Sequence, residues 1–115
     1  MRAISHPDTD TLHLATVFNA LSDPVRLEIV WRLADGEVSC GRLEVGVSKS
    51  TLTHHLKVLR DAGITRTRSA GVSRFVSLRE QDLELRFPGL LELVMSHRSE
   101  AARPRAAGAL AAGAV

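Results

Sequence analysis

The sequence predicts a mainly α-helical domain that carries one β-hairpin, and three observations lead to this fold class. Apolar residues recur at spacings of three and four along most of the chain, which is the period of amphipathic helices. Between Ile64 and Leu78, β-branched residues alternate with polar ones on either side of a turn at Gly71. The chain has 115 residues, which is one domain's length and leaves no room for a separate catalytic domain.

Two helices are expected before residue 36. The first covers about Asp10 to Ala20, and the second covers about Pro24 to Ala34. Asp23 is a suitable N-cap for the second helix, whose first position holds a proline that needs no N–H there. Gly36 is expected to end this helix. Trp31 lies on its apolar side, so we assign Trp31 to the core or to a dimer contact.

A short helix and a longer basic helix come next. The short one is expected over residues 39–45, and the longer one over Lys49 to Ala62 with Ser48 as its N-cap. The exposed side of the longer helix is small, polar and cationic, and it has no acidic residue before Asp61. His55 leans toward the apolar side, so we expect it to be an inward, hydrogen-bonded residue.

The segment after residue 63 is expected to form a hairpin and two further helices. Its strands are Ile64–Arg68 and Val72–Leu78. Residues 77–80 fit a capping box that opens a short turn at Glu80 to Leu85. The last helix covers about Pro88 to Ala102 and is apolar on more than one side, which favours burial against a second copy of the chain.

These elements divide the chain into an N-terminal arm (residues 1–10), the main domain (11–102) and a flexible Ala/Gly-rich tail (103–115). Aromatic residues make up only 3% of the chain, which argues against a surface that stacks single-stranded bases. The N-terminus lacks the apolar core of a signal peptide, and no apolar run nears the roughly 20 residues that cross a bilayer. We therefore expect a cytoplasmic protein with no membrane partner.

The net charge of +2 is unevenly distributed along the chain. Residues 1–45 contain four basic and seven acidic residues, a net charge of −3. Residues 46–75 contain six basic residues and one acidic residue, a net charge of +5, and the remaining residues balance. A local basic segment of this kind is typical of a protein with a polyanionic partner.

The short helix, tight turn and cationic helix form a helix-turn-helix arrangement, and the basic hairpin makes it winged. An α-helix fits the major groove of DNA, where short donors can reach base edges and cations can reach phosphates. Such donors are Ser50, Thr51, Thr53 and His54 on the basic helix. The expected phosphate contacts are Lys49, Lys57 and Arg60, and the hairpin adds Arg66, Arg68 and Arg74 for the neighbouring backbone or minor groove.

Two stretches resemble the ArsR-type (ArsR/SmtB) family of winged helix-turn-helix repressors. Ala20 to Val30, ALSDPVRLEIV, resembles the family's opening signature, and Ser48 to Ile64, SKSTLTHHLKVLRDAGI, resembles its recognition helix. The resemblance covers about Thr11 to Val94. It implies a homodimeric bacterial repressor that pairs through its first and last helices and binds a palindromic operator in double-stranded DNA. Many members release DNA when a metal ion or another inducer binds.

The sequence departs from the metal-sensing members of that family. Those members carry paired cysteines near the third helix, where this chain has Cys40 alone. His97 and Glu100 match a later pair of metal ligands, but Arg86 occupies an earlier ligand position and cannot bind a metal. His97 and Glu100 are metal candidates, but we favour a solvated helix end and expect no cofactor.

Other residues leave alternatives open. Cys40 could be a redox site if its pKa were lowered, although a small buried thiol is the interpretation we favour. His6 and His13 are expected to be surface residues rather than zinc ligands. Because no catalytic motif occurs, we do not expect an enzyme. The competing functions are a winged-helix module that binds a protein, and a repressor that responds to metal or oxidation.

Overall fold

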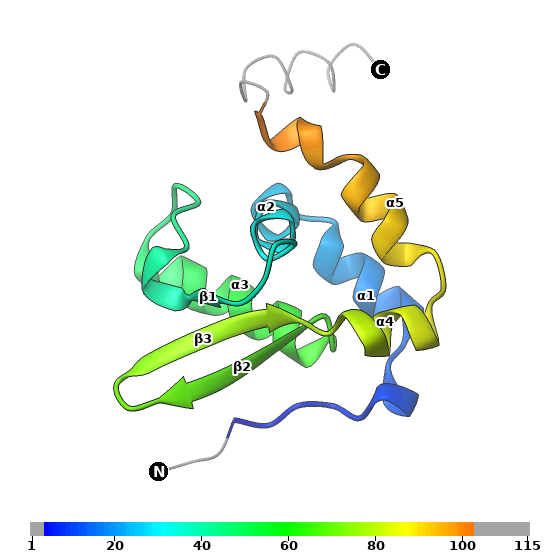
Figure 1. Ribbon diagram of the computed structural model, residues 1–115, viewed down its shortest axis with the longest axis horizontal. Helices are drawn as coiled ribbons and strands as arrows, with labels where there is room; N and C mark the ends of the chain where they lie inside the picture. The colour runs from blue at the N-terminus through cyan, green and yellow to red at the C-terminus, as the bar shows by residue number, and fades with distance from the viewer. Residues whose placement is uncertain (1–3, 103–115) are drawn as a thin grey trace.

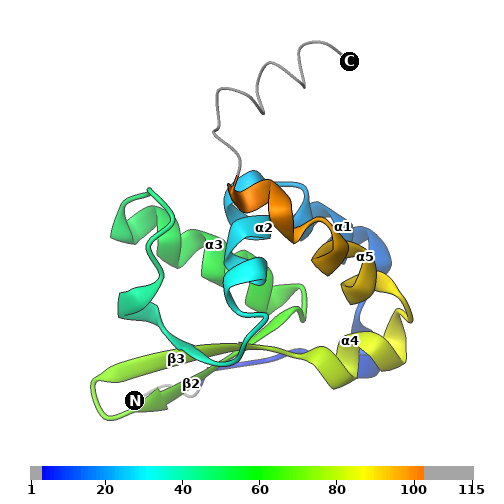
Figure 2. The same cartoon turned by 45° about the horizontal axis from the view of Figure 1, so that its top comes forward.

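The computed structural model describes residues 4–102, and its helices and strands form two groups (Figure 1). The helices are α1 (Leu14–Leu21), α2 (Pro24–Arg32), α3 (Lys49–Asp61), α4 (Glu80–Arg86) and α5 (Leu90–Ser96), and the strands are β1 (Val38–Ser39), β2 (Thr65–Ala70) and β3 (Ser73–Leu78). The hairpin and α3 lie at one end of the molecule, and α1, α4 and α5 lie at the other, with α2 between them (Figure 2). The predicted mainly helical domain with one hairpin is confirmed. The predicted tail lies outside the described residues. Within residues 4–102, no helix is long and apolar enough to cross a membrane.

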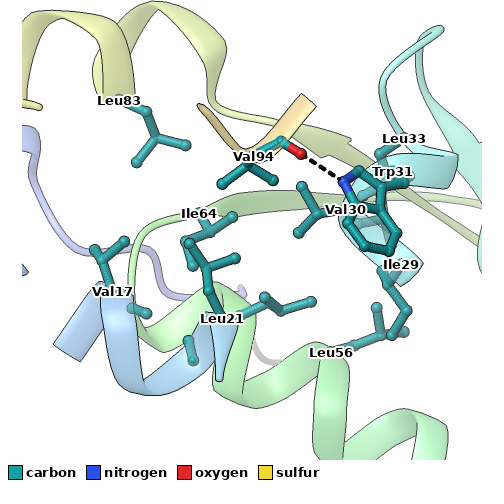
Figure 3. Close-up of a cluster of buried hydrophobic side chains, with 14 of the residues drawn as sticks. Val17, Leu21, Ile29, Val30, Trp31, Leu33, Leu56, Ile64, Leu83 and Val94 are labelled. Atoms are coloured by element: carbon teal, nitrogen blue, oxygen red, sulfur yellow. Dashed lines mark hydrogen bonds between the residues drawn. The ribbon is translucent and has the colours of Figure 1, made fainter. Parts of the chain in front are cut away.

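The core lies where these two groups meet. Ile29, Val30 and Leu33 from the second helical segment and Leu59 from α3 are each at most 1% exposed. Trp31 is also buried, and its indole Nε1 donates to the carbonyl oxygen of Val94 at 2.8 Å, which joins α2 to α5 (Figure 3). The expectation that Trp31 packs in the core is confirmed.

The two predicted N-caps form as expected. The Asp23 carboxylate accepts from the backbone N–H groups of Val25 and Arg26 at 2.8 and 3.1 Å. The Ser48 hydroxyl accepts from the N–H of Thr51 at 3.2 Å. Each cap satisfies N–H groups that have no partner within the helix, which is why α2 and α3 begin where the sequence predicts.

The sheet has one strand more than predicted. Its antiparallel order is β1-β3-β2, and the short β1 pairs Val38 with Val76 and Ser39 with Phe75. Gly71, with φ +64°, makes the turn between β2 and β3. The two residues of β1 carry no strand pattern of their own, because their pairing partner is more than thirty residues away.

The first helix begins four residues later than predicted. A single 3₁₀ turn covers Thr9–Thr11, and Leu12 is then extended and only 2% exposed. The Leu12 side chain fills the space where a Cβ at Gly63 would lie, 2.2 Å from the nearest atom. Arg86 also donates two hydrogen bonds to the Leu12 carbonyl oxygen, so this carbonyl accepts from a side chain.

The predicted helix over residues 39–45 is wrong. The structure has one 3₁₀ turn, Cys40–Arg42, and Ser39 makes no side-chain cap to it. Leu43 and Val45 are both buried, and their spacing of two is that of an extended chain. The helical propensity of this segment is weak. Pairing of Ser39 with the sheet and burial of Leu43 and Val45 therefore favour an extended chain, and only one 3₁₀ turn remains before α3.

The capping box at residues 77–80 is also wrong. β3 continues through Leu78, which pairs with Thr65, and the cap position of α4 falls on Arg79 without a side-chain cap. The backbone N–H of Arg79 donates instead to the carbonyl oxygen of Ile64 at 2.9 Å. Pairing in the sheet therefore replaces the predicted side-chain cap, while α4 begins at Glu80, as predicted, and ends one residue later than predicted, at Arg86.

The last helix is shorter than predicted. It begins at Leu90 after Gly89, whose φ is +87°, and a separate 3₁₀ turn covers Arg98–Ala102. The Leu93 carbonyl oxygen accepts from the Ser96 hydroxyl at 2.6 Å, and the Val94 carbonyl oxygen accepts from the Trp31 indole. The Val94 carbonyl oxygen also accepts from the backbone N–H of His97 at 3.3 Å, so α5 ends in a tighter turn at His97.

Candidate nucleic-acid interface

α3 has a buried side and an exposed polar side. His55, Leu56 and Leu59 face the core. Six of the seven predicted DNA-contacting residues of α3 are exposed, and Arg60 is half-buried. The exposed ones are Lys49, Ser50, Thr51, Thr53, His54 and Lys57. This surface therefore offers hydroxyl, imidazole and ammonium groups to a partner outside the chain.

The hydroxyl groups at the start of α3 already have partners within the chain. The Ser48 hydroxyl, which caps the helix, lies 3.2 Å from the Ser50 hydroxyl and 3.0 Å from that of Thr51. The Thr53 hydroxyl donates its proton to the carbonyl oxygen of Lys49 at 2.9 Å. Thr53 therefore presents its acceptor lone pairs and its methyl group, which can meet a base N–H or a thymine methyl.

Three of the six predicted phosphate-binding cations are paired with carboxylates. The ammonium of Lys57 lies 2.5 Å from Asp61, and the Arg66 guanidinium lies 3.4 Å from Asp82. Arg68 makes two bonds to Glu37, at 2.8 and 2.7 Å, and lies over the ring of Phe75. In the part of the chain that the structure describes, Lys49, Arg60 and Arg74 have no carboxylate partner. Because carboxylates compete for three of these cations, fewer positive charges are free to bind phosphate than the net charge of +5 over residues 46–75 indicates.

The three hairpin arginines do not share one face of the sheet. Thr67 pairs with Val76, and both face the helices, while Arg68 pairs with Phe75 on the opposite face. Because side chains alternate along a strand, Arg66 and Arg68 lie on the face away from the helices, and Arg74 lies on the other. A duplex that touches all three must therefore contact both faces of the wing.

Glu37 is a residue at this surface that the sequence did not indicate. The guanidinium of Arg68 donates to it and holds the pKa of the Glu37 carboxyl below its ordinary value. The pair is separated by 31 residues and depends on the pairing of β1 with β3, which places the start of β1 beside the wing. Nothing in the local sequence around Glu37 could have revealed this contact.

Comparisons with known proteins agree with this geometry. A family model described as a helix-turn-helix domain matches residues 21–68. An uncharacterized HTH-type transcriptional regulator of Bacillus subtilis, YceK, is 42% identical over 68% of this chain and 82% of its own length. The arsenical resistance operon repressor of Staphylococcus xylosus is 40% identical over 62% of this chain and 70% of its own length.

The chain belongs to the ArsR family of winged helix-turn-helix transcriptional regulators. A solution structure from Mycobacterium bovis, described as a homodimeric winged helix-turn-helix DNA-binding domain of a possible ArsR-family regulator, is 26% identical. It covers 73% of this chain and 79% of its own, with a TM-score of 0.61. The predicted family, its winged helix-turn-helix fold and its function as a DNA-binding transcriptional repressor are confirmed.

The candidate sensor residues of this ArsR-family chain have the following surroundings in residues 4–102. Cys40 is half-buried, and burial raises the pKa of its thiol, which is opposite to the lowered value that a redox-active thiol needs. The His97 Nδ1 and the Glu100 carboxylate lie 2.7 Å apart and bond each other. Among residues 4–102, no three histidine, cysteine or acidic side chains gather in a way that could hold a metal.

The two N-terminal histidines have separate environments. His6 Nε2 accepts from the backbone N–H of Thr67 at 3.0 Å, so the arm is bonded to the free edge of β2. His13 is exposed at the start of α1. Arg79, which is only 4% exposed, holds the arm further along by donating to the Pro7 carbonyl oxygen at 2.8 Å. The arm therefore packs on the wing and on α4.

Proposed function

We propose that two copies of this chain bind a palindromic operator, each placing α3 in one major groove and its wing on the adjacent backbone. The observation that supports this most directly is the exposed polar side of α3, which has no acidic residue before Asp61. In this proposal Ser50, Thr53 and His54 contact base edges. Lys49, which has no carboxylate partner in the described chain, contacts phosphate.

The remaining cations and Thr51 complete the proposed contact set. Phosphate contacts come from Lys57 and Arg60 on α3 and from Arg66, Arg68 and Arg74 on the wing. A regulator that blocks transcription in this way acts where the chromosome lies, so we place it in the cytoplasm.

An apolar surface at the other end of the molecule supports the proposed dimer. Leu14 and Phe18 lie one turn apart on α1 and are 44% and 52% exposed. Leu93 on α5 is 59% exposed, and α1 and α5 lie at the same end of the molecule (Figures 1 and 2). Large exposed apolar side chains on helices at one end of the molecule favour burial against a partner, and a second copy matches the homodimeric relative.

The test is binding of the chain to promoter DNA from its own genome across a range of salt concentrations. Affinity should fall steeply as salt rises, because bound phosphates release counterions. Lys49→Ala should weaken binding to every sequence and reduce the slope of log affinity against log salt by about 0.9. Thr53→Ala should mainly reduce discrimination between operator and mutated operator.

Arg32→Ala is the matched control, because Arg32 is an exposed arginine on α2 that already pairs with Glu28. It should leave both the affinity and the salt slope unchanged. Binding that does not depend on salt, or an equal loss in Arg32→Ala and Lys49→Ala, would contradict the proposal. Capture of one protein partner with no DNA would favour the protein-binding alternative instead.

A further inference from the structure

Arg26 connects three helices through one guanidinium. Its Nε donates to the Ala20 carbonyl oxygen at 2.6 Å and its Nη2 to that of Asn19 at 3.4 Å, both in the last turn of α1. Its Nη1 lies 3.0 Å from Nδ1 of His55 on α3. We call Arg26, these two carbonyls and His55 the Arg26 bridge.

The chemistry of the bridge fixes the protonation state of His55. A guanidinium only donates hydrogen bonds, so His55 Nδ1 must be the acceptor and must carry no proton. The ring is then neutral, with its proton on Nε2. Because His55 is only 8% exposed, little water is available to replace Arg26 as a partner if the bond is lost.

The bridge joins the two surfaces on which the proposed function depends. α1 carries Phe18 and Leu14, which we assign to the dimer, and α3 carries the side chains that we assign to the operator. In a dimer on a palindrome, the spacing of the two recognition helices must match the spacing of the half-sites. A rigid polar link from the end of α1 to the middle of α3 would set that spacing.

We propose that the Arg26 bridge holds α3 at a fixed position relative to α1, and that Arg26 and His55 are therefore positioning residues for operator binding. This inference depends on the proposed function. His55 faces the core and Arg26 is half-buried on α2, so neither is among the exposed side chains assigned to DNA. Their loss should lower operator affinity without changing the number of phosphates contacted.

The test compares His55→Asn with His55→Leu. The asparagine side-chain oxygen can accept from Arg26 in the place of Nδ1, whereas leucine cannot accept. Operator affinity and its salt slope are measured by fluorescence anisotropy at pH 7.5. The mass in solution and the helix content are followed in parallel.

We expect His55→Leu to bind operator about tenfold more weakly at pH 7.5, with an unchanged salt slope and an unchanged mass. His55→Asn should bind operator as the unsubstituted chain does, because its side-chain oxygen replaces Nδ1 as the acceptor for Arg26. Arg26→Met should match His55→Leu, and the double variant should be no weaker than either, because both remove one link.

Three results would overturn the proposal: undiminished binding by His55→Leu, an equal loss in His55→Asn and His55→Leu, or a changed salt slope. If His55→Leu does not fold, the operator affinity and salt slope of Arg26→Met decide instead. If the unsubstituted chain shows no salt-dependent operator binding, the proposed function fails. If it binds and the variants match it, only the bridge fails.

Discussion

Arg68 shows how a side chain assigned to DNA can be committed elsewhere in the unbound protein. Its guanidinium donates two hydrogen bonds to the Glu37 carboxylate and lies over Phe75, while more than half of the side chain stays exposed to solvent. Glu37 uses two of the five N–H donors of Arg68 and offsets its charge, so a phosphate that binds Arg68 competes with the Glu37 carboxylate. An exposed ion pair of this kind is weak, so Glu37 should reduce the contribution of Arg68 without abolishing it.

Glu37→Gln should therefore raise affinity for DNA by about twofold to fivefold. It should also steepen the salt slope by up to about 0.9, because Arg68 becomes available to one phosphate. The measurement is a salt titration of operator binding. Glu44→Gln is the control, since it removes the same charge from an exposed glutamate with no ion pair in the structure. Equal gains in both variants would mean that net charge alone, and not release of Arg68, is responsible.

Among the helices and strands, those defined by neighbouring residues in the sequence were predicted better than those that depend on distant pairing partners. α3 was predicted within one residue because its cap at Ser48 and its end at Gly63 are both encoded locally. β1 was missed, and the helix over residues 39–45 was wrong, because both depend on pairing with β3. The candidate DNA contacts on α3 follow from its periodicity, whereas the Glu37 and Arg26 contacts join residues about thirty positions apart.

A hydrogen bond joins the N-terminal arm to the wing, and only a neutral His6 can accept it. His6 Nε2 accepts from the N–H of Thr67, and burial, together with the positive charges of Arg66, Arg79 and Arg60, lowers the pKa of His6 below its ordinary value. The unfolded chain therefore binds the proton more readily than the folded one. The stability that this contact contributes is present above about pH 6.5 and is lost as the pH falls through the lowered pKa of His6.

His6→Gln should reduce this pH dependence, because a glutamine oxygen can accept from Thr67 and does not titrate. Between pH 7.5 and 5, we expect the variant to lose less unfolding free energy than the unsubstituted chain, by up to about 1 kcal/mol, the contribution of one hydrogen bond. Urea unfolding at a series of pH values measures this difference. His13→Gln, at an exposed position before α1, should keep the original pH dependence. The same acid loss in both variants would contradict the assignment to His6.

For the whole molecule, the two ends have different surfaces. The wing and α3 carry the cations, and the end formed by α1 and α5 carries exposed Leu14, Phe18 and Leu93. α1 and α3 are joined by the Arg26 bridge, and α2 and α5 by the bond from Trp31 to Val94. A second copy bound at the apolar end would therefore act on α3 through packed helices and polar links.

Phe18→Asp should convert the proposed dimer into a monomer, because the carboxylate cannot be buried against a second copy without a partner. Operator binding should weaken by at least about tenfold, since a monomer reaches one half-site and loses the effective concentration that the second provides. Sedimentation velocity measures the mass, and anisotropy on full and half operators measures the binding.

Val72→Asp is the control for mass, because Val72 is fully exposed at the tip of the wing and should leave the assembly intact. A half operator should be bound equally by Phe18→Asp and by the unsubstituted chain, because α3 is untouched. A dimeric Phe18→Asp would place the interface elsewhere on the molecule.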